Sequence, residues 1–126
     1  MNQIIRIPYS DISMHFEDDT VCKCLYFHCL LEARKTSLGI IGKLRNNSIS
    51  LERGQFLTTV IQLAKEIDFT PLEIVAALRT LSVDNNKRKS KFSLILEPHT
   101  GFFTKITVKD YDQIISINKK PPKGSL

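Results

Sequence analysis

The chain contains 126 residues, of which 42% are hydrophobic and 25% are charged, a balance typical of one soluble globular domain. This composition excludes wholesale disorder and fibrous repeats. The longest stretch without a charged side chain, from Gly54 to Ala64, has 11 residues, fewer than the roughly 18 that cross a bilayer. Because the N-terminus also lacks the pattern of a secretion signal, we expect a cytoplasmic protein with no membrane span or membrane partner.

The net charge of +5 is distributed unevenly along the chain. Residues 1–78 carry eight Lys or Arg against nine Asp or Glu, whereas residues 79–126 carry ten against four, a net +6. Such a basic segment favours a polyanionic partner, nucleic acid first and an anionic membrane surface second.

The first 17 residues show no sustained periodicity. The isoleucines between Gln3 and Ser13 are interrupted by Arg6 and Pro8, so we expect at most a short strand or an N-terminal arm, 1–17, laid over the core. Acidic residues 17–19 then precede an apolar segment that ends in two bases, the charge order that the helix macrodipole favours. The apolar positions that predict a core helix here are Cys22, Leu25, Tyr26, Cys29 and Ala33.

A short strand and a helix are expected next. The strand falls between Ser48 and Thr58, and Arg53-Gly54-Gln55 within it predicts a turn. We expect Gly54 to supply a positive φ there and Arg53 to pair with a carboxylate at the edge of the core. The helix covers about 60–67, and Thr59 with Gln62 has the spacing of a capping box.

The strongest local signal is Thr70-Pro71-Leu72-Glu73. Thr70 is a favoured N-cap, Pro71 suits the first helical position, and Glu73 has the spacing to complete a capping box. A helix is therefore predicted from here to about Ser82. The side chains expected to point inward are Ile74, Val75, Leu78 and Leu81. Those expected to point outward are Leu72, Glu73, Ala76, Arg79 and Thr80.

A β-hairpin is predicted after a polar, basic loop over residues 84–91. Apolar residues alternate over 92–96 and again over 105–109, with a turn at residues 98–101 between them. Residues 111–117 are expected to add a short strand or a helical turn, and residues 118–126 to form a flexible basic tail.

Together these elements predict an α+β fold, a winged helix-turn-helix over residues 18–117 with a three-helix core and a C-terminal β-hairpin wing. The helix over 70–82 would enter the major groove of duplex DNA, and the basic loop would contact phosphates. The expected DNA-binding residues are Ala76, Arg79 and Thr80 on the helix, Lys87, Arg88, Lys89 and Lys91 in the loop, and Lys105 and Lys109 on the second wing strand. Because Arg79 is the only base of the helix, we expect weak reading of base sequence.

Within a similarity that covers about residues 20–114, four sequence elements occur in order: Leu51-x-Arg53-Gly54-Gln55-Phe56-x-Thr58, Leu63-Ala64 in a helix, a capped helix ending Ala77-Leu78-x-x-Leu81, and a hairpin closing on Thr107-Val108-x-x-Tyr111. This arrangement resembles the N-terminal winged-helix domain of phage and prophage replisome organisers and DnaD-like replication initiation proteins. The resemblance implies DNA binding, self-association into a homo-oligomer, contact with other replication proteins, and a role in DNA replication of a mobile element.

Two other functions fit the same elements. Exposed Leu72, Ala76 and Ala77 could form a dimer or partner surface in a protein-interaction module that binds no DNA. A transcriptional regulator of a mobile element would share the architecture, because a fold alone does not fix a function.

Catalysis and metal binding are not expected. No nucleophile or paired-acid motif accompanies the three histidines, His15, His28 and His99, so we expect no enzyme and no cofactor. Cys24 and His28 share a helical face, but Cys22 and Cys24 lie about 200° apart around a helix axis. We therefore expect reduced cysteines and no zinc site on this helix.

Overall fold

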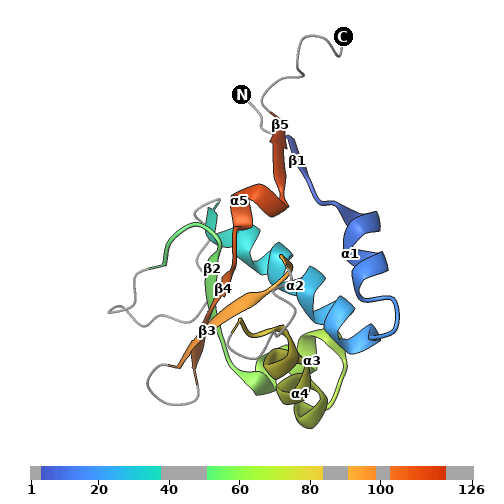
Figure 1. The fold of residues 1–126 in the computed structure, drawn as a ribbon. Coiled ribbons are helices and arrows are strands. Elements are labelled where there is room, and N and C mark those ends of the chain that lie inside the picture. The colour runs from blue at the N-terminus through green and yellow to red at the C-terminus, as the bar shows by residue number, and fades with distance from the viewer. Residues whose placement is uncertain (1–3, 38–50, 84–90, 99–102, 119–126) are drawn as a thin grey trace.

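The structure, a computed structural model, describes residues 4–37, 51–83, 91–98 and 103–118. It is an α+β fold in which helices pack against a three-stranded antiparallel sheet (Figure 1). The helices are α1 (Tyr9–His15), α2 (Thr20–Ser37), α3 (Val60–Ile67), α4 (Pro71–Leu81) and α5 (Tyr111–Ile114). The strands are β1 (Ile4–Arg6), β2 (Gln55–Thr58), β3 (Leu94–Pro98), β4 (Thr104–Val108) and β5 (Ser116–Asn118).

The sheet has the strand order β2-β4-β3. The predicted hairpin is confirmed, since β3 and β4 pair antiparallel with Leu96 opposite Ile106, and β2 joins the other edge of β4 with Phe56 opposite the same residue. Ile106 and Val108 are buried. Because side chains alternate between the faces of a strand, Lys105 and Lys109 lie on the face turned away from the helices. The predicted turn falls largely on residues 99–102, outside the described part of the chain.

Helix α2 is the central helix, as its apolar pattern predicts. It runs between the sheet on one side and α1 on the other (Figure 1), and it packs on α3, α4, β2 and β4. Leu25, Tyr26 and Cys29 are fully buried along it. At its N-terminal end Cys22 Sγ lies 3.9 Å from the carbonyl oxygen of Ala77, where α4 crosses.

The N-terminal segment contains a helix that the sequence analysis missed. The expected short strand exists as β1, but α1 follows it with Pro8 as its N-cap. The sequence predicts that Pro8 interrupts regular structure, yet a proline at a helix start loses no hydrogen bond, because the first N–H groups have no partner in the helix. Ile12 is fully buried and Phe16 lies against the ring of Tyr26, so this segment belongs to the core.

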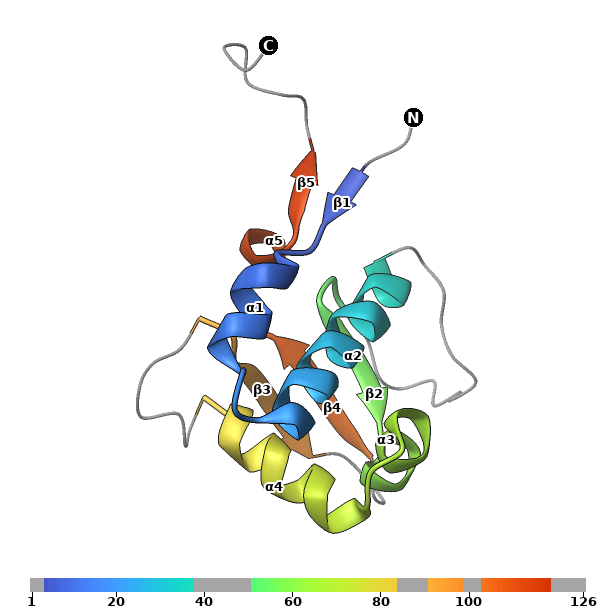
Figure 2. The ribbon, with the colours of Figure 1, turned by 90° about the vertical axis from the view of Figure 1, so that its right-hand side faces the viewer.

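The two distant ends of the described chain form a second, two-stranded ribbon. β1 pairs antiparallel with β5, with Ile5 opposite Ile117, and the ribbon projects at the end of the molecule opposite α3 and α4 (Figure 2). Residues 111–117 were expected to form either a strand or a helical turn, and both occur in succession as α5 and β5. The predicted tail lies, apart from residue 118, outside the described residues.

The bounds predicted for α3 and α4 are confirmed to within a residue, because local capping sets them. Thr70 Oγ1 accepts a hydrogen bond from the N–H of Glu73, and the carboxylate of Glu73 accepts one from the N–H of Thr70, which completes the capping box. The box predicted at α3 is only half formed. Thr59 Oγ1 accepts from the N–H of Gln62, but the Gln62 side chain donates to Glu66 instead of reaching back.

Two positions on α4 differ from expectation. Val75, predicted to point inward, is 39% exposed, and Ala77, counted among the exposed apolar residues, is only 4% exposed. The buried stripe follows the helical spacing of Ile74, Ala77, Leu78 and Leu81. Val75 lies off this stripe, because the next residue on the same face of a helix comes three or four positions later.

Candidate functional site

The outward face of α4 is the surface that the sequence analysis singled out. Leu72, Glu73, Ala76, Arg79 and Thr80 are all exposed. Arg79 forms no ion pair with any residue that the structure describes, so its guanidinium is available to a ligand. The Thr80 hydroxyl instead donates to the carbonyl oxygen of Ala76 at 3.1 Å, within the helix.

A shallow groove lies beside this face, between α4 and the hairpin. It is lined by Val60, Val75, Leu78, Arg79, Ser82 and Leu96. Most of these residues are apolar, and Arg79 is the only cation among the described residues that line the groove. Arg79 therefore lies where the exposed face of α4 meets β3.

The predicted basic loop is described only at its end. Lys87, Arg88 and Lys89 lie outside the described residues. Lys91 is exposed, and its ammonium lies 5.4 Å from the centre of the Phe92 ring, a cation–π contact. Because Phe92 is buried, this contact anchors the chain just before β3, the first strand of the hairpin, and leaves the charge of Lys91 facing solvent.

Lys105 and Lys109, predicted as DNA-binding residues of the second wing strand, each lie beside a carboxylate. The Lys105 side chain is 16% exposed and its ammonium lies 3.5 Å from a carboxylate oxygen of Glu97 on the neighbouring strand. Lys109 is more exposed and lies 3.4 Å from Asp110. Both occupy the outer face of the sheet, and each has a neighbouring carboxylate that offsets its charge.

The Arg53-Gly54 turn has the structural role that was predicted for it. Gly54 has a φ of 88°. Arg53 Nε lies 2.6 Å from Asp112 Oδ1, and its guanidinium lies 5.6 Å from the centre of the Tyr111 ring. The turn thus ties β2 to α5 at the edge of the core.

The cysteines on α2 act as packing residues. Cys22 and Cys29 are buried and Cys24 is half-buried, and all three are free thiols. Burial, reinforced by the nearby carboxylate of Asp19, raises the pKa of Cys22 to about 12. Burial and the charge of Glu32 raise the pKa of Cys29 as well, so both thiols are neutral at physiological pH.

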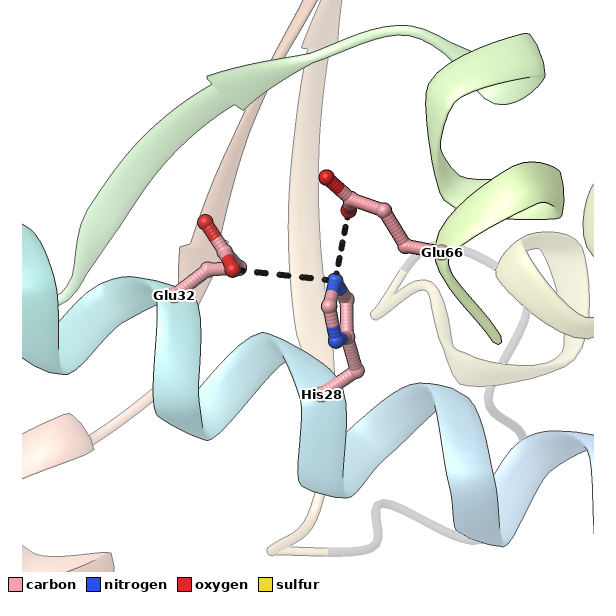
Figure 3. Close-up of side chains that lie close together, drawn as sticks. All are labelled: His28, Glu32 and Glu66. Atoms are coloured by element: carbon pink, nitrogen blue, oxygen red, sulfur yellow. Dashed lines mark hydrogen bonds and ion pairs between the residues drawn. The ribbon is translucent and has the colours of Figure 1, made fainter. Parts of the chain in front are cut away.

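One polar cluster was missed. His28 and Glu32, one turn apart on α2, meet Glu66 from α3 (Figure 3). His28 Nε2 lies 2.7 Å from Glu66 Oε1 and 3.8 Å from Glu32 Oε2. Burial opposes ionisation of Glu66, but hydrogen bonds from Gln62 and His28 outweigh it and lower the pKa of Glu66 overall. The spacing of His28 and Glu32 was a usable signal for this cluster, whereas nothing local points to Glu66.

Comparison of the chain with protein-family models, with curated proteins and with solved structures gave no match. No helix within the described ranges is both long enough and apolar enough to span a membrane. Function must therefore be inferred from the geometry and the charges of the chain itself.

Proposed function

We propose that the chain is a DNA-binding protein of the winged helix-turn-helix class, in which α4 enters the major groove. The observation that carries this proposal is the position of α4. It is anchored from within by its buried stripe while its opposite face, with Arg79, is open to solvent. The topology also supports the proposal. Along the chain the elements occur in the order α2, β2, α3, α4, β3, β4, and in the sheet β4 lies between β2 and β3. A winged helix likewise combines a DNA-contacting helix with an adjacent hairpin.

The charge distribution supports DNA as the ligand. The segment that follows Leu78 carries a net +6. Its densest part is the loop with Lys87, Arg88, Lys89 and Lys91, which leads directly from α4 into β3. Phosphate contacts from this loop would supply most of the affinity, while Arg79, Ala76 and Thr80 would face the base edges. Lys105 and Lys109 would contribute less, because carboxylates already offset their charges.

The biological role that we propose is replication initiation of a phage or another mobile element, with the chain acting as a homo-oligomer in the cytoplasm. This part rests on the resemblance to replisome organisers described above. A transcriptional regulator would use the same DNA surface.

A binding titration on random-sequence duplex and on single strands tests the proposal. Fluorescence anisotropy at about 50 mM and about 200 mM salt should show that affinity falls steeply, because four to six neutralised phosphates give a log–log slope of about −4 to −5. No binding to either form of DNA at the lower salt concentration would refute the proposal.

Two charge-matched pairs of variants test which surface binds. The triple variant K87E/R88E/K89E should abolish binding, whereas K119E/K120E/K123E removes the same charge from the C-terminal tail and should weaken binding far less. R79E should weaken binding, and R34E, at the end of α2 away from α4 (Figure 2), should not. Equal losses within each pair would mean that net charge alone attracts DNA, which would refute the assigned surface.

A second candidate, a protein-interaction module, is favoured by the apolar side chains on the same region. Leu72 is 81% exposed, Val75 lies three residues later on α4 and is 39% exposed, and Ile61 of α3 is 56% exposed. Light scattering with and without DNA separates the two functions. The interaction module would be favoured by a stable oligomer that dissociates in the L72E variant, together with an absence of DNA binding at low salt.

A further inference from the structure

Three side chains capable of binding a metal ion meet between α2 and α3. One ligand atom from each of His28, Glu32 and Glu66 lies within 4.8 Å of the other two. Figure 3 shows the imidazole of His28 between the two carboxylates, one from each helix. Because Glu66 comes from α3, the packing of α3 on α2 assembles the group.

The distances within the group are close to those that a bound ion would impose. Zn–N and Zn–O bonds of about 2.0–2.2 Å in a tetrahedron place neighbouring ligand atoms roughly 3.3–3.6 Å apart. His28 Nε2 lies 2.7 Å from Glu66 Oε1 and 3.8 Å from Glu32 Oε2, on either side of this spacing. The third pair, the Glu32 and Glu66 oxygens, lies within 4.8 Å, so we expect side-chain rotation to close the remaining differences.

Neighbouring contacts orient both carboxylates. Gln62 Nε2 donates to Glu66 Oε2 at 2.7 Å, which leaves Oε1 directed at the imidazole. Such a hydrogen bond to the outer oxygen is the usual support of a carboxylate ligand. Lys35 has the opposite effect, because its ammonium lies 2.9 Å from Glu32 Oε2 and competes with a cation for that oxygen.

The chemistry of the group favours a transition-metal ion. One imidazole and two carboxylates match the ligands of zinc sites, whereas Mg²⁺ prefers oxygen ligands alone. The side chains of His28, Glu32 and Glu66 are 16%, 22% and 32% exposed, so an ion could reach them while remaining partly shielded from water. Three protein ligands leave a fourth position for water.

We propose that His28, Glu32 and Glu66 bind one divalent ion of the zinc type, which bridges α2 and α3. The ion takes the place of the direct hydrogen bond between His28 and Glu66 and ties the two helices together. This site lies outside the proposed DNA surface, and its ligands do not depend on DNA binding.

Calorimetric titration of Zn²⁺ into the metal-free, reduced full-length chain tests the proposal. We expect one equivalent to bind and the thermal midpoint to rise, since a ligand that binds only the folded state stabilises it. Mg²⁺ at the same concentration should have neither effect. E66Q preserves the size of the side chain and should lower zinc affinity by at least about tenfold, while E17Q, at an exposed glutamate outside the group, should leave it unchanged. K35M should raise zinc affinity, because it removes the competing ammonium.

The alternative is that zinc binds to the cysteines, so the experiment must distinguish thiolate ligands from nitrogen and oxygen ligands. A Co²⁺ spectrum without thiolate charge-transfer bands, together with unchanged zinc affinity in C24S, assigns binding to nitrogen and oxygen ligands. Circular dichroism of E66Q checks that the variant is folded. The proposal is overturned if no saturable one-to-one binding occurs, if E66Q and H28A bind zinc as tightly as the unmodified chain, or if the Co²⁺ spectrum shows thiolate ligation.

Discussion

Replacing Gly54 with alanine should destabilise the fold through two separable effects. The first is the backbone conformation, because a φ of 88° costs a residue with a Cβ about 1–2 kcal/mol. The second is steric, because the new Cβ would lie 2.9 Å from Cβ and 3.2 Å from Cγ of buried Tyr111. Cβ of Tyr111 is fixed to the backbone of α5 and can move only with it, so this overpacking adds about 1–2 kcal/mol. We expect G54A to lose about 2–4 kcal/mol, which for a chain of this size lowers the melting temperature by roughly 10 °C.

Urea unfolding followed by circular dichroism measures this loss, and D68G provides the matched control. Asp68 also has a positive φ, 61°, at the C-terminal end of α3, but it is exposed. Glycine there removes the backbone strain with no steric change, so D68G should be neutral or gain up to about 1 kcal/mol. A G54A variant that loses less than about 1 kcal/mol would show that neither the strain nor the contact with Tyr111 holds this turn in place.

Three further outcomes follow from the caps and the cysteines. T70A removes the oxygen that accepts from the N–H of Glu73 and should cost about 1 kcal/mol in a urea titration; an unchanged midpoint would contradict the capping box. Stability should fall above the ordinary thiol pKa of 9.0, because Cys22 and Cys29 stay protonated in the folded chain while the unfolded chain loses those protons. For each thiol, the free energy of unfolding should fall by up to about 1.4 kcal/mol per pH unit. A free energy of unfolding that stays constant between about pH 8 and about pH 10 would refute this prediction. In native protein a thiol reagent should label half-buried Cys24 first, with the buried pair reacting only on unfolding; equal rates for all three would contradict their burial.

The elements that could be predicted from the sequence are those whose determinants are local. The bounds of α3 and α4 follow from Thr59 and Thr70, which bond to N–H groups three residues away. The hairpin follows from alternation on two strands close in sequence. The central position of α2 follows from its wide apolar stripe, which includes Leu25, Tyr26 and Cys29 and must be buried against other elements.

Two missed features, the pairing of β1 with β5 and the cluster at His28, depend on contacts between distant parts of the chain. β1 and β5 pair across almost the whole sequence, Ile4 with Asn118, and three residues of each strand carry too little pattern to reveal a partner. The cluster at His28 was missed for the same reason, because Glu66 is 38 positions away on another helix. Within α2 alone, His28 pointed to Cys24 instead.

Helix α3 connects the two proposed sites, and its geometry determines how strongly they could influence each other. Its C-terminal half carries Glu66, and only residues 68–70 separate it from α4. If an ion held between α2 and α3 changed DNA affinity by some factor, DNA would change the affinity for the ion by the same factor. The position of α4, however, is already fixed by its capping box and by fully buried Ile74 and Leu81. An ion that binds the DNA-free and DNA-bound forms equally shifts neither equilibrium. We therefore expect zinc to raise the stability of the fold, while DNA affinity is determined by Arg79 and the basic loop.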